Sequence, residues 1–126
     1  MLVNTKPWTE VLVDTKDFTV YKDSFPVTEG HVLFVPKVED WQHLVKCWEA
    51  AYKWGYDWTE RGYCEAFNIG QNVGEAAGQT VEYAHVHLIP RRKGDMADPR
   101  GGVRHVIPSK GNYRKDLPNG NESTTN

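Results

Sequence analysis

Two histidines, His85 and His87, stand two residues apart in a stretch rich in apolar and β-branched residues. Side chains alternate along a β-strand, so the two imidazoles and Tyr83 are predicted to share one face. Val86 then lies on the opposite face, where an apolar side chain fixes the strand against a core. The pattern predicts two imidazoles side by side on one face of a strand.

The histidine pair has three interpretations on its residues alone. The first is a polar strand face without chemistry. The second is a metal site, but zinc needs three or four ligands, and the other histidines, His31, His43 and His105, show no ligand spacing. The third is a nucleophilic site, in which one imidazole attacks phosphorus and its neighbours bind the phosphoryl oxygens. We predict that no metal is bound.

A glycine-containing turn, Gly78-Gln79-Thr80, comes directly before this strand. Backbone amides in glycine turns and neutral imidazole N–H groups both suit an anionic group such as phosphate. The turn and the histidines together therefore favour a site for a phosphorylated ligand.

Five segments that have the composition of β-strands must position these groups. They are residues 11–13, 18–21, 31–35, 64–69 and 81–90. The first two flank a turn and predict a hairpin. The third is almost continuously apolar, which is typical of a strand in the interior of a sheet.

One long helix is predicted over residues 39–61, where Pro is absent and apolar residues recur at three-and-four spacing. The aromatic residues of its apolar stripe are Trp41, Trp48, Tyr52 and Tyr56. This stripe is predicted to lie in the core or in a dimer interface. Trp54 and Trp58 lie off the stripe and are predicted to be exposed.

The composition excludes several classes of partner. The 126 residues have room for one domain, and 15 Lys+Arg against 17 Asp+Glu give a net charge of −2. This balance argues against a general binder of nucleic acid or of anionic membranes. No apolar run has the length of a signal peptide or a membrane span, so a cytoplasmic location is predicted.

The two cysteines and the C-terminal residues complete this outline. Cys47 and Cys64 form no CxxC pair and are predicted to be free thiols in or near the core. Residues 116–126 are polar, with Leu117 as the one core-building side chain, and are predicted to be a disordered tail. Residues 1–115 are predicted to form the domain.

The motif Gly78-Gln79-Thr80-Val81, followed by His85-Val86-His87-Leu88-Ile89-Pro90-Arg91, resembles the signature of the histidine triad (HIT) nucleotide hydrolases and transferases. Further blocks are similar to that family from about residue 18 to 113, and point to its bacterial or fragile-histidine-triad-like branch. These blocks are Asp23-Ser24-Phe25-Pro26-Val27, Gly30-His31-Val32-Leu33, Asn72-Val73-Gly74 and Asp98-Pro99-Arg100-Gly101-Gly102. The resemblance implies an α+β fold with an antiparallel sheet of about five strands, one long helix and a homodimer.

The resemblance also implies the catalytic roles. His85 matches the histidine that attacks the α-phosphorus and becomes nucleotidylated. His87 matches the histidine that contacts the phosphate, and Gln79 matches a side chain that binds phosphate or leaving-group oxygens.

Four further positions are implied to bind or support the substrate. Asp23 stands where the family holds the ribose hydroxyls, a suitable task for a carboxylate that accepts two hydrogen bonds. Asn72 and Thr80 are implied to bind phosphate oxygens, and His31 to pack beneath the site. The aromatic side chains around a stacked base are implied to be Phe18, Tyr21 and Phe25.

Tyr83 departs from the family pattern, which has histidine at the first position of the triad. In the family this residue supports the nucleophile mainly through its backbone carbonyl, which survives any substitution. We expect the Tyr83 hydroxyl to bond His31 and activity to be retained. The alternative is a protein that still binds nucleotide and has lost catalysis.

The resulting hypothesis is a hydrolase that cleaves at the α-phosphate of dinucleoside polyphosphates, nucleoside polyphosphates or nucleoside phosphoramidates through a covalent nucleotidyl-histidine. The alternatives are a nucleotide-binding module and a nucleotidyltransferase of the same superfamily. Val86 stands where the sugar-phosphate uridylyltransferase branch carries Pro, which disfavours that branch. No tightly bound cofactor is expected, although a divalent cation can accompany a polyphosphate substrate.

Overall fold

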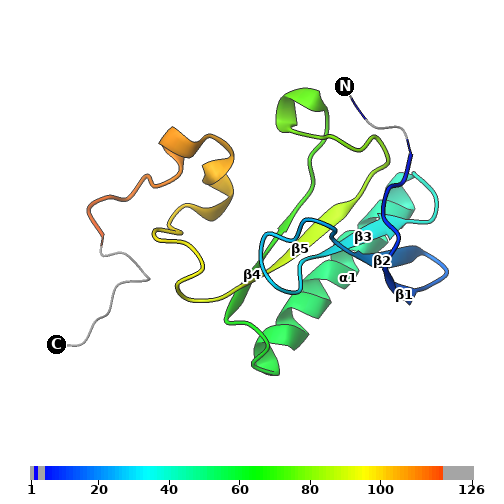
Figure 1. Ribbon diagram of the computed structural model, residues 1–126, viewed down its shortest axis with the longest axis horizontal. Coiled ribbons are helices and arrows are strands. Elements are labelled where there is room, and N and C mark those ends of the chain that lie inside the picture. Colours follow the sequence, from blue (N-terminus) through cyan, green and yellow to red (C-terminus); the bar gives the residue numbers. More distant parts are fainter. Residues whose placement is uncertain (1, 3–4, 118–126) are drawn as a thin grey trace.

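The computed structural model describes residue 2 and residues 5–117. It contains five strands, one long helix and three short 3-10 helices in this part of the chain (Figure 1). The strands are β1 (Val11–Asp14), β2 (Phe18–Lys22), β3 (Val32–Pro36), β4 (Ala66–Gly70) and β5 (Val86–Arg91). The helices are α1 (Trp41–Glu60), η1 (Glu75–Ala77), η2 (Gly102–Val106) and η3 (Pro108–Lys110). The α+β fold is therefore confirmed.

The five strands form one antiparallel sheet in the order β1-β2-β3-β5-β4. The hairpin β1-β2 closes because the Thr15 hydroxyl donates to the Phe18 carbonyl at 2.8 Å and accepts from the Phe18 amide at 3.0 Å. All five residues of β3 are buried, as the apolar run predicts. The pairing of β3 with β5 places Leu33 opposite His87 and joins the N-terminal strands to the histidine segment.

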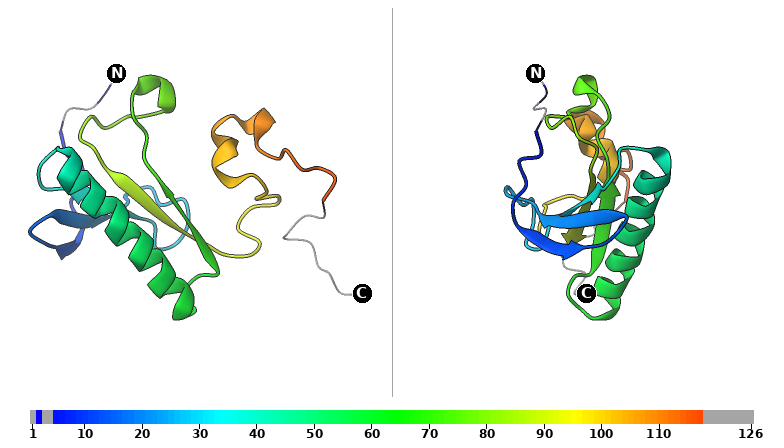
Figure 2. Two further views of the ribbon diagram at one scale, coloured as in Figure 1. Left: turned by 180° about the vertical axis from the view of Figure 1, so that it is seen from behind. Right: turned by 90° about the vertical axis from the view of Figure 1, so that its right-hand side faces the viewer.

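Helix α1 covers one face of the sheet (Figure 2). It begins after Asp40, whose carboxylate caps it by accepting from the His43 amide at 2.8 Å. Its buried residues are Cys47, Ala51 and Gly55. These small side chains let the helix approach closely: a Cβ at Gly55 would lie 2.5 Å from the Phe67 ring. Both cysteines are free and buried, as predicted.

The prediction for the aromatic residues of α1 is wrong in part. Trp54 and Trp58, predicted to be exposed, pack against the core, and Trp54 meets the Phe34 ring edge-on at 5.0 Å. The predicted stripe faces outward, with Trp41 74% exposed and Tyr52 56% exposed, so it does not lie in the core, and the alternative of a dimer interface stays a prediction. The small residues Cys47, Ala51 and Gly55 define a second stripe along the helix. This stripe packs against the sheet because small side chains permit a closer approach than the aromatic ones.

The fifth strand starts at Val86 and not at residue 81 as predicted. Three of the backbone groups before it are bound by side chains. The Gln79 amide donates to the carbonyls of Val81 and Glu82, at 3.0 and 2.9 Å, and Glu39 accepts from the Ala84 amide at 2.9 Å. His85 therefore lies just before the strand, in a loop that side chains hold in place.

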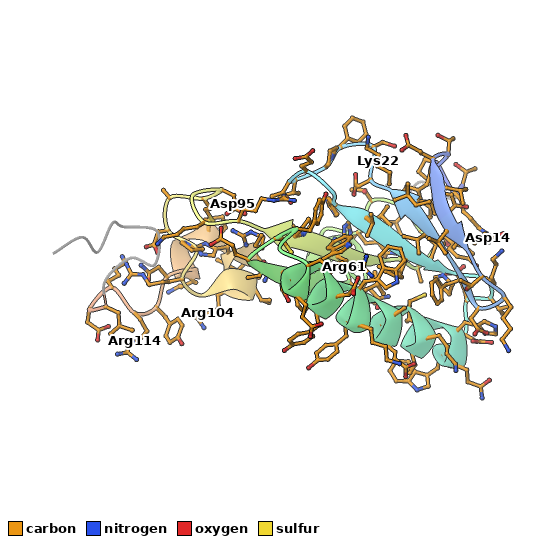
Figure 3. The ribbon with its side chains drawn as sticks, turned by 90° about the horizontal axis from the view of Figure 1, so that it is seen from below. Asp14, Lys22, Arg61, Asp95, Arg104 and Arg114 are labelled. Atoms are coloured by element: carbon orange, nitrogen blue, oxygen red, sulfur yellow. The ribbon has the colours of Figure 1, made fainter. Side chains whose placement is uncertain are left out.

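After β5 the chain leaves the sheet and forms a C-terminal segment that contains η2 and η3 and lies beyond the β4 edge (Figure 1). Figure 3 shows Asp95 where this segment begins and Arg104 and Arg114 farther along it. The predicted boundary at residue 115 falls near the end of the described part, and residues 118–126 of the predicted tail lie outside it. In the described residues no helix combines the length and hydropathy of a membrane span.

Candidate active site

A cavity of about 470 Å³ lies on the face of the sheet opposite α1. Its lining includes Leu33 and Trp8, which belong to the apolar cluster on that face. The predicted site residues that the structure brings together around it are Asp23, Asn72, Thr80, His85 and His87. They come from the loop after β2, the loops between β4 and β5, and the start of β5. Residues 23 and 87, far apart in the sequence, thus meet at one site.

The backbone carbonyl of Tyr83 lies 2.8 Å from Nδ1 of His85. A carbonyl oxygen can only accept, so Nδ1 carries the proton and Nε2 keeps its lone pair. His85 is 8% exposed and lines the cavity, where the Trp8 ring packs against its imidazole at 4.9 Å. This imidazole has the tautomer and the orientation that a nucleophile requires.

His31 and His87 form a hydrogen-bonded chain that begins at the backbone of Val27. The Val27 amide donates to Nδ1 of His31 at 3.1 Å, so Nε2 of His31 carries the proton. That nitrogen lies 2.9 Å from Nδ1 of His87 and donates to it. The proton of His87 is therefore on Nε2, which is left as a donor for a ligand in the cavity.

His31 and His87, the two histidines of this hydrogen-bonded chain, are both neutral near pH 7. Burial, followed by the proximity of His31 and His85, lowers the pKa of His87 to about 4. Burial also lowers the pKa of His31, against the opposing effect of the Asp23 carboxylate. His87 therefore offers a hydrogen bond to an anionic ligand and not a positive charge.

Asp23, His31 and His87 have ligand atoms within 4.8 Å of one another, a spacing that a metal ion could bridge. A metal at this group would need the lone pair of Nε2 of His31. The Val27 amide donates to Nδ1 of the same ring, and this contact holds the proton on Nε2. The hydrogen-bonded chain accounts for the group, and absence of a metal stays our prediction.

Gln79 does not line the cavity. Its side-chain oxygen accepts from the Gly74 amide at 2.7 Å, and its nitrogen donates to the two carbonyls named above. All of these contacts lie within the loop that carries Thr80. In this arrangement Gln79 acts on the site by holding that loop, and a direct contact with phosphate would require it to release these bonds.

The expected contact between Tyr83 and His31 is absent from the structure. The Tyr83 hydroxyl donates to the Pro36 carbonyl at 2.7 Å, and burial raises the pKa of the phenol. His31 instead bonds His87 and Val27. Tyr83 thus supports His85 through its carbonyl, while its side chain ties the loop to the end of β3.

Replacing Tyr83 with phenylalanine tests this division of roles. The variant loses the bond to Pro36, so its free energy of unfolding is expected to fall by about 1 kcal/mol in urea denaturation. Because the carbonyl remains, turnover by Tyr83→Phe is expected to stay within about three-fold of that of the natural sequence. A loss of turnover by a hundred-fold without loss of stability would contradict the assignment.

Sequence reasoning missed Trp8, and of the three aromatic residues expected around a base only Phe25 lines the cavity. Phe18 packs into the core against Phe34 at 5.6 Å, Tyr21 lies against Trp8 at 5.8 Å, and Phe25, which is 88% exposed, lines the cavity. Trp8 precedes the first strand in a segment without periodicity. The one sequence feature that could have indicated its role is that it is a large aromatic residue in an otherwise polar stretch.

The fold and the site define an α+β protein with a histidine-lined cavity, and comparison with known proteins identifies the family. Residues 6–94 match the model of the HIT domain. The chain belongs to the HIT family.

A curated relative is "Bis(5'-nucleosyl)-tetraphosphatase [asymmetrical]" of Schizosaccharomyces pombe, 30% identical over 120 residues, which are 90% of this chain and 66% of that protein. Another is "Adenosine 5'-monophosphoramidase HNT1" of Candida albicans, 31% identical over 94 residues, 64% of this chain and 60% of that protein. The chain thus spans less than two-thirds of the length of either relative. Among solved structures, the "ZN-bound histidine triad family protein from Mycobacterium smegmatis" is similar with a TM-score of 0.62 and 28% identity, over 68% of this chain and 67% of that one.

Proposed function

We propose that this protein is a nucleotide hydrolase that cleaves at the α-phosphate of dinucleoside polyphosphates or nucleoside phosphoramidates. The observation that carries the proposal is the His85 imidazole, held at Nδ1 by the Tyr83 carbonyl with Nε2 left free in the cavity. The two relatives above bear the names of enzymes that act on such compounds, which supports the same class of reaction.

The reaction follows from this tautomer in two displacements. Nε2 of His85 attacks the α-phosphorus, a P–N bond forms, and the bond to the leaving group breaks with its electron pair on that group. A leaving phosphate oxygen departs as an anion, whereas a leaving nitrogen takes up a proton from solvent and departs as a neutral amine. Water then attacks the nucleotidyl-histidine, the P–N bond returns its electron pair to Nε2, and the water's proton passes to solvent. The Nε2–H of His87 is directed at the charge that develops on the phosphoryl oxygens.

The other cavity residues supply binding. The Asp23 carboxylate is assigned to the ribose hydroxyls, and its position is fixed because one oxygen accepts from the Phe25 amide at 2.8 Å. Asn72 and Thr80 are assigned to phosphate oxygens. Among the described residues that line the cavity none is Lys or Arg, so a divalent cation that accompanies the polyphosphate would supply the missing positive charge.

The proposal is tested with the purified protein, diadenosine triphosphate, diadenosine tetraphosphate and adenosine 5'-phosphoramidate, with products separated by ion-exchange chromatography. Cleavage at the α-phosphate gives AMP from each, with ADP or ATP as the second product of the dinucleotides. Binding of AMP without cleavage of any compound would overturn the proposal in favour of a nucleotide-binding module. Products that appear only when an acceptor other than water is added would favour a nucleotidyltransferase.

A homodimer is part of the proposal, and the outward stripe of α1 supports it. Trp41, Tyr52 and Tyr56 are each at least half exposed on this helix, and among the described residues the neighbouring strand β4 forms an edge of the sheet. Exposed aromatic residues beside an open strand edge suit a second copy of the chain. Sedimentation velocity is expected to give a dimer, and Tyr52→Glu is expected to shift the protein toward monomer.

The cytoplasmic location stays a prediction from the sequence.

A further inference from the structure

Glu39 stands two residues before helix α1, and its side chain reaches the loop that carries His85. Its Oε2 accepts from the Ala84 amide at 2.9 Å, although the two residues are 45 positions apart in the sequence. Glu39 does not line the active-site cavity. The contact therefore joins the start of α1 to the backbone beside the nucleophile, outside the space assigned to a ligand.

The Ala84 amide and the Tyr83 carbonyl belong to one peptide group, and both are hydrogen-bonded. The N–H donates to Glu39, and the carbonyl accepts from Nδ1 of His85 at 2.8 Å. In a trans peptide these two groups point in opposite directions, so the carboxylate and the imidazole lie at opposite ends of it. A charged acceptor at the N–H polarises the peptide, which makes its carbonyl a stronger acceptor for Nδ1. Glu39, the peptide and His85 thus form a continuous hydrogen-bonded series.

The short connection between β3 and α1 holds Glu39 in place. It consists of residues 37–40, between Pro36 at the end of β3 and the first residue of α1. Asp40 caps the helix, and the backbone amides at the start of a helix favour an ionised carboxylate. The Tyr83 hydroxyl donates to the Pro36 carbonyl, so this end of β3 and the connection meet the loop before β5 at two points. The acceptor on Glu39 is therefore both positioned and charged.

The charge of Glu39 also acts on the residue whose carbonyl holds the nucleophile. Burial, followed by the Glu39 charge, raises the pKa of the Tyr83 phenol. Glu39 is exposed, so water screens its charge and limits the effect to a moderate size. The carboxylate is therefore suited to adjusting the nucleophile and not to reacting itself.

We propose that Glu39 is a positioning residue for the nucleophile, which acts on His85 through the peptide group between Tyr83 and Ala84. The inference rests on the proposed function. When Nε2 of His85 forms the P–N bond, the ring becomes positively charged and keeps its proton on Nδ1. The polarised carbonyl stabilises this proton and this charge, and the carboxylate takes up no proton, as in a Ser-His-Asp triad but with a peptide group in between. Glu39 thus lowers the barrier to attack without contacting the substrate.

The test compares two substitutions of Glu39 with one of its neighbour. Glu39→Ala removes the acceptor, whereas Glu39→Gln keeps an acceptor and removes the charge. We expect kcat/KM for diadenosine tetraphosphate, which includes the attack by His85, to fall about ten-fold in Glu39→Ala and about three-fold in Glu39→Gln, the scale of one hydrogen bond. The Kd of AMP, measured by calorimetry, is expected to stay within about two-fold in both, because the ground state is not altered.

Asp40→Asn is the matched control. It removes one carboxylate from the adjacent residue and leaves a side chain that also caps helices. Asp40 accepts from the His43 amide and does not line the cavity. Both kcat/KM and the Kd of AMP are expected to be unchanged in this variant. An equal loss of kcat/KM in Asp40→Asn and Glu39→Gln, or a loss of AMP affinity as large as that of kcat/KM in Glu39→Ala, would overturn the inference.

The tautomer of His85 gives a readout that needs no turnover. Long-range proton–nitrogen NMR correlations of the imidazole rings report it at about pH 8, where a histidine with an ordinary pKa is neutral, and His85→Ala assigns the signals. The natural sequence and Asp40→Asn are expected to show the form protonated on Nδ1, and Glu39→Ala a smaller share of that form. An unchanged tautomer in Glu39→Ala would contradict the inference. If the protein cleaves no compound, the proposed function fails, and the tautomer alone decides whether Glu39 positions this ring.

Discussion

Replacing His85 with alanine is expected to lower kcat by about 10³-fold or more, since removal of a covalent nucleophile in other enzymes costs on this scale. The variant loses the atom that attacks phosphorus, while the carboxylate of Asp23 and the donor on His87 remain. Binding of AMP, measured by calorimetry, is therefore expected to stay within about ten-fold. Turnover is measured by chromatography of the products from diadenosine tetraphosphate.

His43→Ala is the matched control for this variant. His43 lies in the first turn of α1, where its ring pairs with Asp40 at 2.6 Å, outside the cavity. Its turnover is expected to remain within about two-fold of that of the natural sequence. If His85→Ala, correctly folded by circular dichroism, keeps turnover within ten-fold, His85 does not form a covalent intermediate and the proposed mechanism is excluded.

The sequence predicted the fold well because its strongest patterns are local. The apolar run of β3, the hairpin turn at Thr15 and the Pro-free residues 39–61 each depend on neighbours within one element. The choice between the two stripes of α1 is different. Periodicity reveals that a helix is amphipathic, but it does not reveal that Ala51 and Gly55 pack more closely on a sheet than a row of tyrosines.

The sequence predicts which residues form the site, but it does not predict the hydrogen bonds that join them. The spacing of His85 and His87 predicts that their rings are neighbours, and the two ring centres lie 5.1 Å apart. The bond from His31 to His87 joins residues 56 positions apart, and the Val27 amide sets its direction. Such contacts depend on the pairing of β3 with β5, which single-sequence patterns do not determine. Trp8 was missed for the same reason.

The stability of the protein is expected to fall as the pH is lowered from 6.5 toward 4, because His87 binds its proton more weakly when folded. An unfolded histidine titrates near pH 6.5, whereas burial lowers the pKa of folded His87 to about 4. Between these values the unfolded state holds more protons, so acid favours it. By pH 4.5 the free energy of unfolding is expected to be about 2 kcal/mol lower than at pH 7.5. Above about pH 7.5, where the unfolded histidine has also lost its proton, the contribution of His87 is constant.

The measurement is urea denaturation at pH 7.5, 6.0 and 4.5, with His87→Asn as the reference. Protonation of the paired carboxylates also destabilises the folded state, but the pKa of Asp95 is held at about 2 by its bonds to Arg91, so that loss comes at lower pH. His87→Asn should therefore lose less stability than the natural sequence over this range. A residual decrease is still expected, because burial lowers the pKa of His31 in the same direction. Equal decreases in both proteins would show that His87 is not buried as a neutral donor, and the phosphate contact assigned to it would then lack its basis.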